Sequence, residues 1–334
     1  MKRIISILLT MTMILCITTS IPLSASAATT DKVESNLTYT DKYGSWTYKL
    51  TDKGNGYKIT GYDKSMNDIE IPNAINNIPV VEIGENAFKD CSSLTSIIIP
   101  DSVTTISDFA FCRCVNLTNI TIPDSVTTIG GYAFSDCCSL TNIIIPNSVT
   151  TIGDYAFSWC SKLNSITISD SVTTIPMYAF WNCYKLTNIT LPDSVTTISA
   201  YAFYGCTRLA SITIPDSVTY IGTDAFYNCS NLNDVYYTGS KSEWNSISIK
   251  GNAGTGDYDY LKKATVHYNY VIPKSGDVSG DGEISIIDVV YLLKYIIGDI
   301  ELTDEQLKNA DVNSDGEFTV IDAIMIQNII LEIS

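Results

Sequence analysis

The sequence has few histidines and few basic residues. Its 334 residues include one histidine, His267, and 20 Lys/Arg against 36 Asp/Glu, which gives a formal net charge of −16. Ser-His-Asp triads, Cys-His pairs and His-ligated zinc would all depend on that one side chain, so the composition argues against histidine-based catalysis. The acidic balance argues against nucleic-acid binding, which needs clustered Lys/Arg. No Cys-x-x-Cys pair occurs, which argues against zinc.

Long apolar runs are also scarce beyond the N-terminus. Lys2 and Arg3 precede an apolar run over residues 4–17, and Ala25-Ser26-Ala27 supplies the small residues that a signal peptidase reads. This pattern predicts a secretory signal peptide over residues 1–27, with an uncleaved membrane anchor as the alternative. No later segment has about 18 consecutive apolar residues, so we expect an extracellular, soluble mature protein.

A repeat of 23 residues occupies the middle of the chain. Ala-Phe recurs from Phe88 to Phe226, a cysteine follows each phenylalanine after three residues, and a leucine follows each cysteine after three more. Most copies continue as Ile-x-Ile-Pro and Ser-Val-Thr-x-Ile. Ile-x-Ile predicts a short strand, Pro-Asp a turn, and Ala-Phe-x-x-Cys-x-x-Leu a helical or near-helical segment. A fixed period of this length predicts a solenoid of seven stacked coils.

The repeat resembles the BspA-like leucine-rich repeats of bacterial surface and secreted proteins, a family associated with binding and adhesion. We therefore expect a mainly β or α+β solenoid over residues 69–239, followed by a small all-α module at the C-terminus. An N-terminal cap hairpin is expected over residues 28–68, a C-terminal cap over 240–270 and a linker over 271–275. The histidine falls in the C-terminal cap, where we expect a structural role for it.

Seven of the nine cysteines that remain after signal cleavage share one column of the repeat. Stacked coils point their Cβ atoms in parallel, so we expect a ladder of buried free thiols rather than disulfides. A disulfide between Cys112 and Cys138, which lie outside the column, or between the neighbours Cys137 and Cys138, is the alternative.

Tyrosine and tryptophan side chains also follow the repeat. They occupy columns separate from the phenylalanines, so we expect them to be at least partly exposed as a surface for sugars or proteins. Packing of the rings between coils is the alternative. The ligand surface predicted in this way consists of Tyr132, Tyr155, Trp159, Tyr178, Trp181, Tyr184, Tyr201, Tyr204 and Tyr227. The outward strand positions hold polar residues such as Asn188 and Thr190. They form a second docking face, or the residues are there because of their β-propensity.

The C-terminal segment carries much of the acidity, with 13 Asp/Glu against 3 Lys/Arg from Val271 to Ser334. Two stretches in it, residues 277–288 and 311–322, match the spacing of 12-residue calcium loops. Calcium takes oxygen ligands, and Gly282 and Gly316 allow the sharp turns. The predicted ligands of two Ca²⁺ ions are Asp277, Ser279, Asp281, Glu283, Ser285, Asp288, Asp311, Asn313, Asp315, Glu317, Thr319 and Asp322. The two glutamates are expected to ligate through their backbone carbonyls.

An apolar helix follows each loop, predicted over residues 288–297 and 322–331, and Thr303-Asp304-Glu305-Gln306 predicts a capped connecting helix. This duplication over residues 276–334 resembles a type I dockerin, which docks onto a cohesin of a scaffoldin in a cellulosome. The helices hold more apolar residues than one inward stripe needs, which favours a partner. The resemblance implies cohesin contacts at Ile286, Ile287, Leu293, Lys294, Val320, Ile321, Gln327 and Asn328. The likeness of the two copies implies two docking orientations.

We therefore expect a secreted, cellulosome-associated protein without catalytic activity. Its dockerin docks onto a cohesin, and its solenoid binds a protein or a plant polysaccharide. The alternatives are a polysaccharide-degrading enzyme and a structural spacer. A glycosidase would need two carboxylates in one cleft. The array offers Glu82, Asp108, Asp136 and Asp154, which stand on differing columns, and this argues against catalysis.

Overall fold

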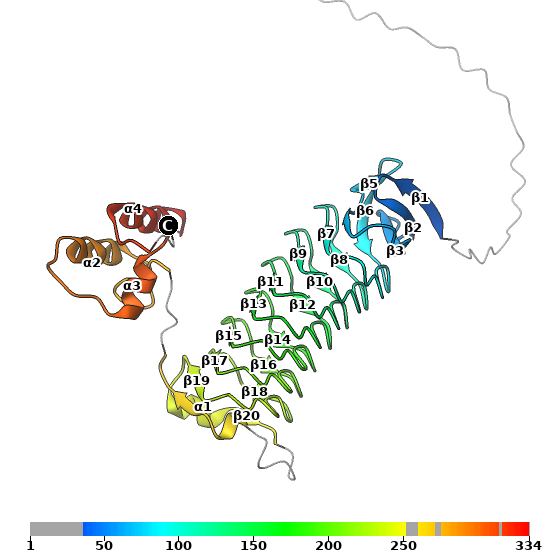
Figure 1. Cartoon of the computed structure of the whole chain (residues 1–334). Coiled ribbons are helices and arrows are strands. Elements are labelled where there is room, and N and C mark those ends of the chain that lie inside the picture. Colours follow the sequence, from blue (N-terminus) through cyan, green and yellow to red (C-terminus); the bar gives the residue numbers. More distant parts are fainter. Residues whose placement is uncertain (1–35, 252–259, 271–274, 314–315, 334) are drawn as a thin grey trace, which may run out of the picture. The chain divides into compact units, whose positions relative to one another are not determined.

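The computed structural model describes residues 36–251, 260–270, 275–313 and 316–333. The signal peptide predicted over residues 1–27 and most of the predicted linker lie outside them. The described residues between 68 and 251 form a stack of short coils that repeats every 23 residues, and the chain ends in three helices (Figure 1). A solenoid of about eight turns, where the repeat predicts seven coils, and a small helical module at the C-terminus confirm the predicted fold class.

The Ile-x-Ile segments form one column of short parallel strands. Equivalent residues pair between coils, as in Ser165 with Asn142, because the repeat length is constant. The column consists of β4 (Asp68–Glu70), β7 (Ser96–Ile98), β9 (Asn119–Thr121), β11 (Asn142–Ile144), β13 (Ser165–Thr167), β15 (Asn188–Thr190), β17 (Ser211–Ile214), β19 (Asp234–Tyr237) and β21 (Thr265–His267). In most of these strands the central isoleucine is buried and its two neighbours are exposed, as period-two alternation requires.

A second column of shorter parallel strands lines another side of the solenoid. It arises from the Thr-Ile pair after Ser-Val-Thr, whose isoleucine is buried in each coil. The column consists of β6 (Ile78–Ile83), β8 (Thr105–Ile106), β10 (Thr128–Ile129), β12 (Thr151–Ile152), β14 (Thr174–Ile175), β16 (Thr197–Ile198), β18 (Tyr220–Ile221) and β20 (Ser248–Ile249). The two columns enclose one continuous apolar core.

Stacked phenylalanines run through the middle of that core. The seven rings from Phe88 to Phe226 are buried, and neighbouring centroids lie 5.1–5.9 Å apart with nearly parallel planes. The leucine of each repeat, such as Leu163, is also buried. One coil could not bury these side chains alone, so the stack of coils supplies the hydrophobic stabilisation.

The corner segments from Ala-Phe to Leu are turns and not α-helices, so of the two predicted forms, helical or near-helical, only the near-helical one fits. Two residues in each corner, such as Tyr132 (φ 54°) and Asp136 (φ 59°), adopt left-handed backbone conformation, which an α-helix excludes. Alternate backbone N–H groups donate to the next coil, as when Phe134 donates to the carbonyl of Ala156 at 2.8 Å. The others donate to the carbonyl three residues earlier, as when Ser135 donates to Tyr132 at 3.1 Å. Hydrogen bonds between coils therefore alternate with short bonds within the turn.

Strands and a short helix close the two ends of the core. At the N-terminal end β1 (Leu37–Asp41), β2 (Gly44–Leu50) and β3 (Tyr57–Tyr62) are antiparallel, and β3 pairs with β6, which β5 (Ala74–Ile75) also joins. At the other end lie α1 (Lys241–Ser246), the 3-10 turn η1 (Tyr260–Lys262) and β21. His267 on β21 stacks on Tyr236, and its Nε2 lies 2.8 Å from Oδ1 of Asp234. These contacts support a structural role for the histidine.

The seven column cysteines are buried free thiols, as predicted, and no disulfide links Cys112 to Cys138. From the second coil onward each column thiol donates to the phenylalanine carbonyl of the preceding coil, as in Cys160 Sγ to Phe134 O at 3.2 Å. From Cys137 to Cys229 burial raises the pKa of the column thiols, to about 12 for Cys206. The column is therefore a ladder of protonated, weakly hydrogen-bonded thiols.

We expect Ellman's reagent to label Cys138 rapidly in the native mature protein and the column thiols only after unfolding. Cys138 is half-exposed, whereas the column thiols are shielded and held protonated. The measurement is the number of thiols labelled before and after adding denaturant. Rapid native labelling of column thiols, or their absence after unfolding, would contradict the ladder.

Three helices make up the C-terminal module: α2 (Ile286–Ile296), α3 (Asp304–Ala310) and α4 (Val320–Ile333). Its small core contains Val278, Leu292 and Ile326. The capping box predicted for the connecting helix is confirmed, because Thr303 Oγ1 accepts from Gln306 N and the Gln306 side chain accepts from Thr303 N. Among the described residues no helix has the length and apolarity needed to cross a bilayer.

Candidate calcium loops, docking helices and ligand surface

The first loop is organised around two buried carboxylates. Asp277 accepts backbone N–H bonds from Gly280 and Gly282, each at 2.8 Å. Asp288, in the first turn of α2, accepts from Ser279 N at 2.8 Å and from Ser285 N at 2.7 Å. Both side chains are fully buried. The loop is thus folded around its first and last predicted ligands.

The second loop repeats this arrangement around Asp322. One of its oxygens accepts from Val312 N at 3.1 Å, and the other from Thr319 N at 3.0 Å. Asp311 accepts from Gly316 N at 3.0 Å. Like Asp288, Asp322 is fully buried. The predicted ligand Asp315 lies outside the described residues.

These loops fit a divalent cation. Asp277, Asp288 and Asp322 are buried carboxylates, and none of them pairs with a lysine or arginine in the described part of the chain. A buried charge requires compensation, and a hard cation with oxygen ligands supplies it. The side chains are not gathered into a finished site, since no three acidic, cysteine or histidine groups converge on one point among the described residues.

The remaining predicted ligands have different surroundings. Ser285 and Thr319 act as helix caps, with their hydroxyls accepting from Ile287 N and Ile321 N. Because of these caps both helices start two residues earlier than predicted. Asp281 is exposed and accepts from Glu283 N at 2.9 Å. The other predicted ligands, Asn313 and Glu317, lie on the second loop, half-buried and exposed respectively.

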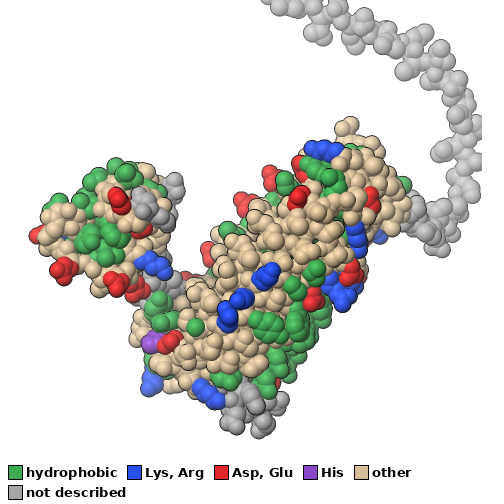
Figure 2. All heavy atoms as spheres, viewed as in Figure 1, with side chains coloured by type: hydrophobic (Ala, Val, Ile, Leu, Met, Phe, Trp, Pro, Cys, Tyr) green, Lys and Arg blue, Asp and Glu red, His purple; other side chains and the backbone are tan. Residues whose placement is uncertain are grey.

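The eight residues predicted to contact a cohesin are all exposed. On α2 the side chain of Ile286 is 62% exposed and that of Ile287 is 49% exposed, whereas Val289 and Leu292 are buried. On α4 Val320 and Ile321 are 53% and 58% exposed. Figure 2 shows hydrophobic side chains on the surface of this module. Each helix therefore has an inward apolar stripe and a second, outward one.

A ladder of stacked aromatic rings follows the corners of the solenoid. Tyr132, Tyr155, Tyr178 and Tyr201 stack in sequence with centroids 4.4–4.6 Å apart, and each is half-buried. Burial raises the pKa of Tyr155 to about 12. The rings thus both pack between coils and remain partly exposed, and their role as a ligand surface stays a prediction. Because their faces cover one another, the ladder offers edges and hydroxyl groups to solvent.

The sequence analysis missed one member of this ladder. Phe109 stacks on Tyr132 at 4.7 Å. It stands immediately before Ala-Phe in its own coil, as Tyr132 does, and this position could have revealed it. All five rings occupy left-handed positions, where the first and last coils carry Asn86 and Asp224, residues that tolerate this conformation better. In the five central coils, stacking of the rings therefore offsets the free-energy cost of the left-handed backbone conformation.

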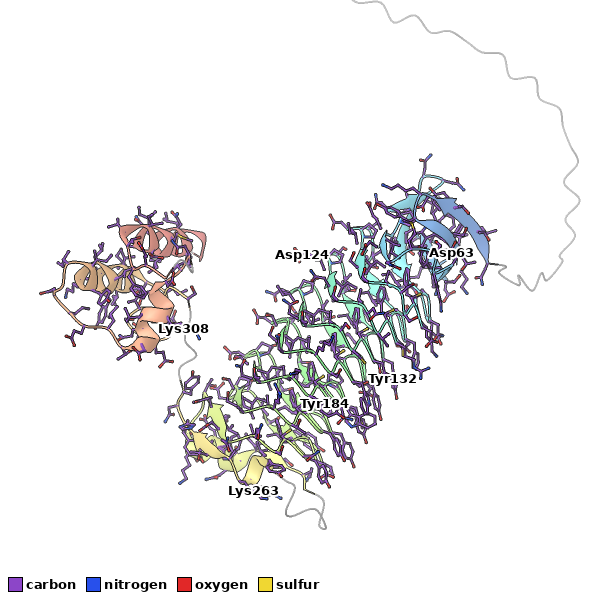
Figure 3. The ribbon with its side chains drawn as sticks, in the orientation of Figure 1. Asp63, Asp124, Tyr132, Tyr184, Lys263 and Lys308 are labelled. Atoms are coloured by element: carbon purple, nitrogen blue, oxygen red, sulfur yellow. The ribbon has the colours of Figure 1, made fainter. Side chains whose placement is uncertain are left out.

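Beside the ladder, other aromatic side chains meet edge to face. Trp181 lies 5.7 Å from Trp159 at 67°, and Trp159 lies 5.8 Å from Tyr184 at 86°. Tyr204 stacks on Tyr227. Tyr132 and Tyr184, labelled in Figure 3, both come from corner segments of the solenoid. A hollow of about 410 Å³ adjoins the rings; its lining includes Lys89, Phe109, Arg113, Tyr132, Asp136, Trp159 and Trp181.

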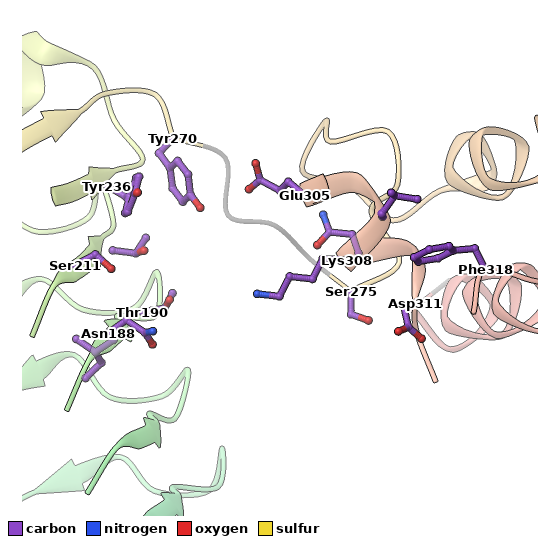
Figure 4. A pocket seen from close by; sticks show the side chains of 14 residues that line it. Asn188, Thr190, Ser211, Tyr236, Tyr270, Ser275, Glu305, Lys308, Asp311 and Phe318 are labelled. Atoms are coloured by element: carbon purple, nitrogen blue, oxygen red, sulfur yellow. The ribbon is translucent and has the colours of Figure 1, made fainter. Parts of the chain in front are cut away.

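The outward residues of the first strand column form the polar face expected from the sequence. Asn188, Thr190 and Ser211 project from β15 and β17 (Figure 4). Two isoleucines interrupt this face, Ile98 and Ile144, which are 61% and 69% exposed. The face is therefore flat and mostly polar, with isolated apolar positions.

The carboxylates considered for catalysis have structural partners. Glu82 pairs with Lys58 at 3.1 Å. Asp108 accepts from Gly131 N at 2.7 Å, and Asp154 accepts from Met177 N at 2.9 Å. Each of these two side chains thus links its own coil to the backbone of the next one. These contacts give the carboxylates a role in stacking the coils.

Two family models match the chain. The BspA type leucine rich repeat region matches in six copies over residues 60–144, 81–196 and 127–253, which together cover more than half of the chain. The dockerin type I domain matches residues 275–331. The chain therefore belongs to the BspA-type leucine-rich repeat proteins, and it carries a C-terminal type I dockerin. Type I dockerins bind calcium and dock onto cohesins, and the repeat family is non-catalytic in kind.

Several solved structures resemble the solenoid. The leucine-rich repeat protein of T. pallidum is 27% identical over 62% of this chain and 95% of that one, with a TM-score of 0.46. A leucine-rich repeat protein from Bacteroides ovatus is 28% identical over 70% of this chain and 72% of that one, with a TM-score of 0.42. The comparison with curated proteins gave no match.

Proposed function

We propose that this protein is a secreted, non-catalytic component of a cellulosome. Its dockerin attaches the chain to a scaffoldin, and its solenoid binds a target outside the cell. The observation that carries the proposal is the pairing of a duplicated loop–helix module with a repeat solenoid, in which Asp108 and Asp154 bond to the backbone of the next coil. The N-terminal residues 1–27, with the pattern of a signal peptide, support export.

Two calcium ions are proposed to complete the dockerin, one in each loop. Asp277 and Asp288 would hold the first ion, and Asp311 and Asp322 the second, together with the other predicted oxygen ligands. The ions would compensate the buried carboxylates and fix each loop against the helix that follows it. Folding of the module is then coupled to calcium.

The outward apolar stripes of α2 and α4 are proposed as the cohesin-binding face. Ile286 and Ile287 on one helix correspond to Val320 and Ile321 on the other, and all four are exposed. Apolar side chains this exposed favour a partner that buries them. Because the two stripes are so similar, either helix can present the contact, which gives two docking orientations.

A calcium-dependent pull-down tests the proposal. The mature protein is immobilised and exposed to the proteins secreted by its host, with calcium or with chelator, and bound chains are identified by mass spectrometry. We expect a cohesin-bearing scaffoldin to be recovered only with calcium. Recovery of no cohesin-bearing protein would contradict attachment to a cellulosome.

A further inference from the structure

Three basic side chains form a straight row on the solenoid. Lys162, Lys185 and Arg208 each stand two residues after the column cysteine of their coil, and all three are exposed. Figure 2 shows Lys and Arg side chains following one another along the solenoid, beside a strip of hydrophobic side chains. The row is notable because the chain as a whole is strongly acidic.

Nothing in the stacking of the coils requires these cations. The same position holds Asn116, Ser139 and Asn231 in other coils. Within the described residues the ion pairs involve other side chains, and none joins the row to a carboxylate. Neighbouring coils lie about 4.8 Å apart, so three like charges repel one another along the row. A ligand with matching negative charges would relieve that repulsion.

Aromatic side chains flank the row. Tyr184 precedes Lys185 in the sequence and meets Trp159 edge to face, and Trp159 in turn meets Trp181. In an edge-to-face pair only one ring turns its face to the other, so this cluster covers fewer of its ring faces than the stacked ladder does. Cations and aromatic rings thus share one surface.

We infer that this surface binds a linear polyuronate, an acidic polysaccharide with one carboxylate on each pyranose ring. The inference rests on the proposed role of the solenoid as a binding module and specifies its ligand. A polyuronate carries carboxylates along its whole length, so a chain that lies along the row can bring carboxylates to the three cations. The apolar C–H faces of the sugar can pack against the neighbouring rings.

An acidic peptide fits the row less well. Its Asp and Glu side chains can meet the cations, but they offer no apolar C–H face of a ring to the aromatic flank. Nucleic acid is disfavoured by the acidity of the rest of the chain. The cations together with the aromatic flank therefore favour the polysaccharide.

The test compares binding of a short oligogalacturonate to the mature full-length protein and to a triple variant, by calorimetry without free calcium. The variant carries Lys162→Ser, Lys185→Asn and Arg208→Asn, residue types that other coils already hold at this position. We expect its affinity to fall by at least about tenfold.

The matched control carries Lys53→Asn, Lys241→Asn and Lys250→Asn, three exposed lysines outside the row, and we expect a change within about twofold. Wild-type binding should weaken from about 50 mM to about 500 mM salt.

Three results would overturn the inference: no binding of oligogalacturonate to the wild type, equal losses in both variants, or equal binding of polyglutamate. Polyglutamate bound equally would identify an acidic polypeptide as the ligand. Xylan is the neutral probe. Binding of xylan that is unchanged in the triple variant, without binding of oligogalacturonate, would refute the polyuronate and leave the solenoid as a binding module. Capture of a cohesin by the same proteins, after calcium is added back, reports on the dockerin separately.

Discussion

Replacing Asp277 and Asp311 by asparagine is expected to abolish the calcium-dependent folding of the dockerin while the solenoid stays folded. Asparagine keeps the shape and the acceptor oxygen but removes the charge that attracts the ion. Metal binding in such modules is coupled to folding, so loss of the ion exposes the small core around Leu292 and Ile326. The measurement is far-UV circular dichroism during a calcium titration, on the mature wild-type protein and the double variant.

The control for this prediction changes charge without touching the loops. Asp299→Asn with Glu301→Gln removes two exposed charges from the segment between α2 and α3. This pair should keep the calcium-dependent gain in helix. If the loop variant gained helix at the same calcium concentration as the wild type, the two aspartates would not be ligands.

Replacing Ile287 and Ile321 together by aspartate is expected to block cohesin binding, with an affinity loss of at least about a hundredfold. Both side chains are exposed on outward apolar stripes, so the change adds charge to the proposed contact without disturbing the core. Each single variant should bind within about twofold of the wild type, because the intact helix can still present its stripe. Calorimetry with a purified type I cohesin in calcium gives the affinities.

The single variants decide between one and two docking orientations. Complete loss of binding from Ile287→Asp alone, with Ile321→Asp unaffected, would mean that only α2 makes the contact. Unchanged calcium-induced helix in all variants shows that the dockerin still folds. Full binding by the folded double variant would remove both stripes from the interface.

The repeat made most of the solenoid core predictable. A residue that recurs every 23 positions meets its own copies in the neighbouring coils, so one pattern decides its burial throughout. The buried stack from Phe88 to Phe226 and the free thiols of the same coils follow from this. The alternation in Asn-Ile-Thr likewise predicts the strand and the side that faces the core.

The corners were not predictable in the same way. The spacing Ala-Phe-x-x-Cys-x-x-Leu suits a helix, but the backbone N–H of Phe134 donates to the next coil. A pattern within one coil does not reveal hydrogen bonds between coils. Tyr132 and Tyr155 illustrate this, since left-handed conformation in bulky residues is tolerated only because stacking holds them.

In the dockerin, too, some features could be predicted from the sequence and others could not. Loop spacing alone places Asp277 and Asp288 at the two ends of one loop, and both prove to be buried there. The capping roles of Ser285 and Thr319 were missed because a hydroxyl at that position suits either a metal or a helix start. The basic row was missed because it occupies only three coils, among them those of Lys162 and Lys185.

The central claim is that calcium switches on docking of this chain to a cohesin. The most direct test is calorimetry of the mature protein with a purified type I cohesin, first with calcium and then with excess chelator. We predict saturable binding of one cohesin per chain with calcium and no heat of binding with chelator. Binding of equal strength in both conditions, or no binding to any type I cohesin tested with calcium, would contradict the account.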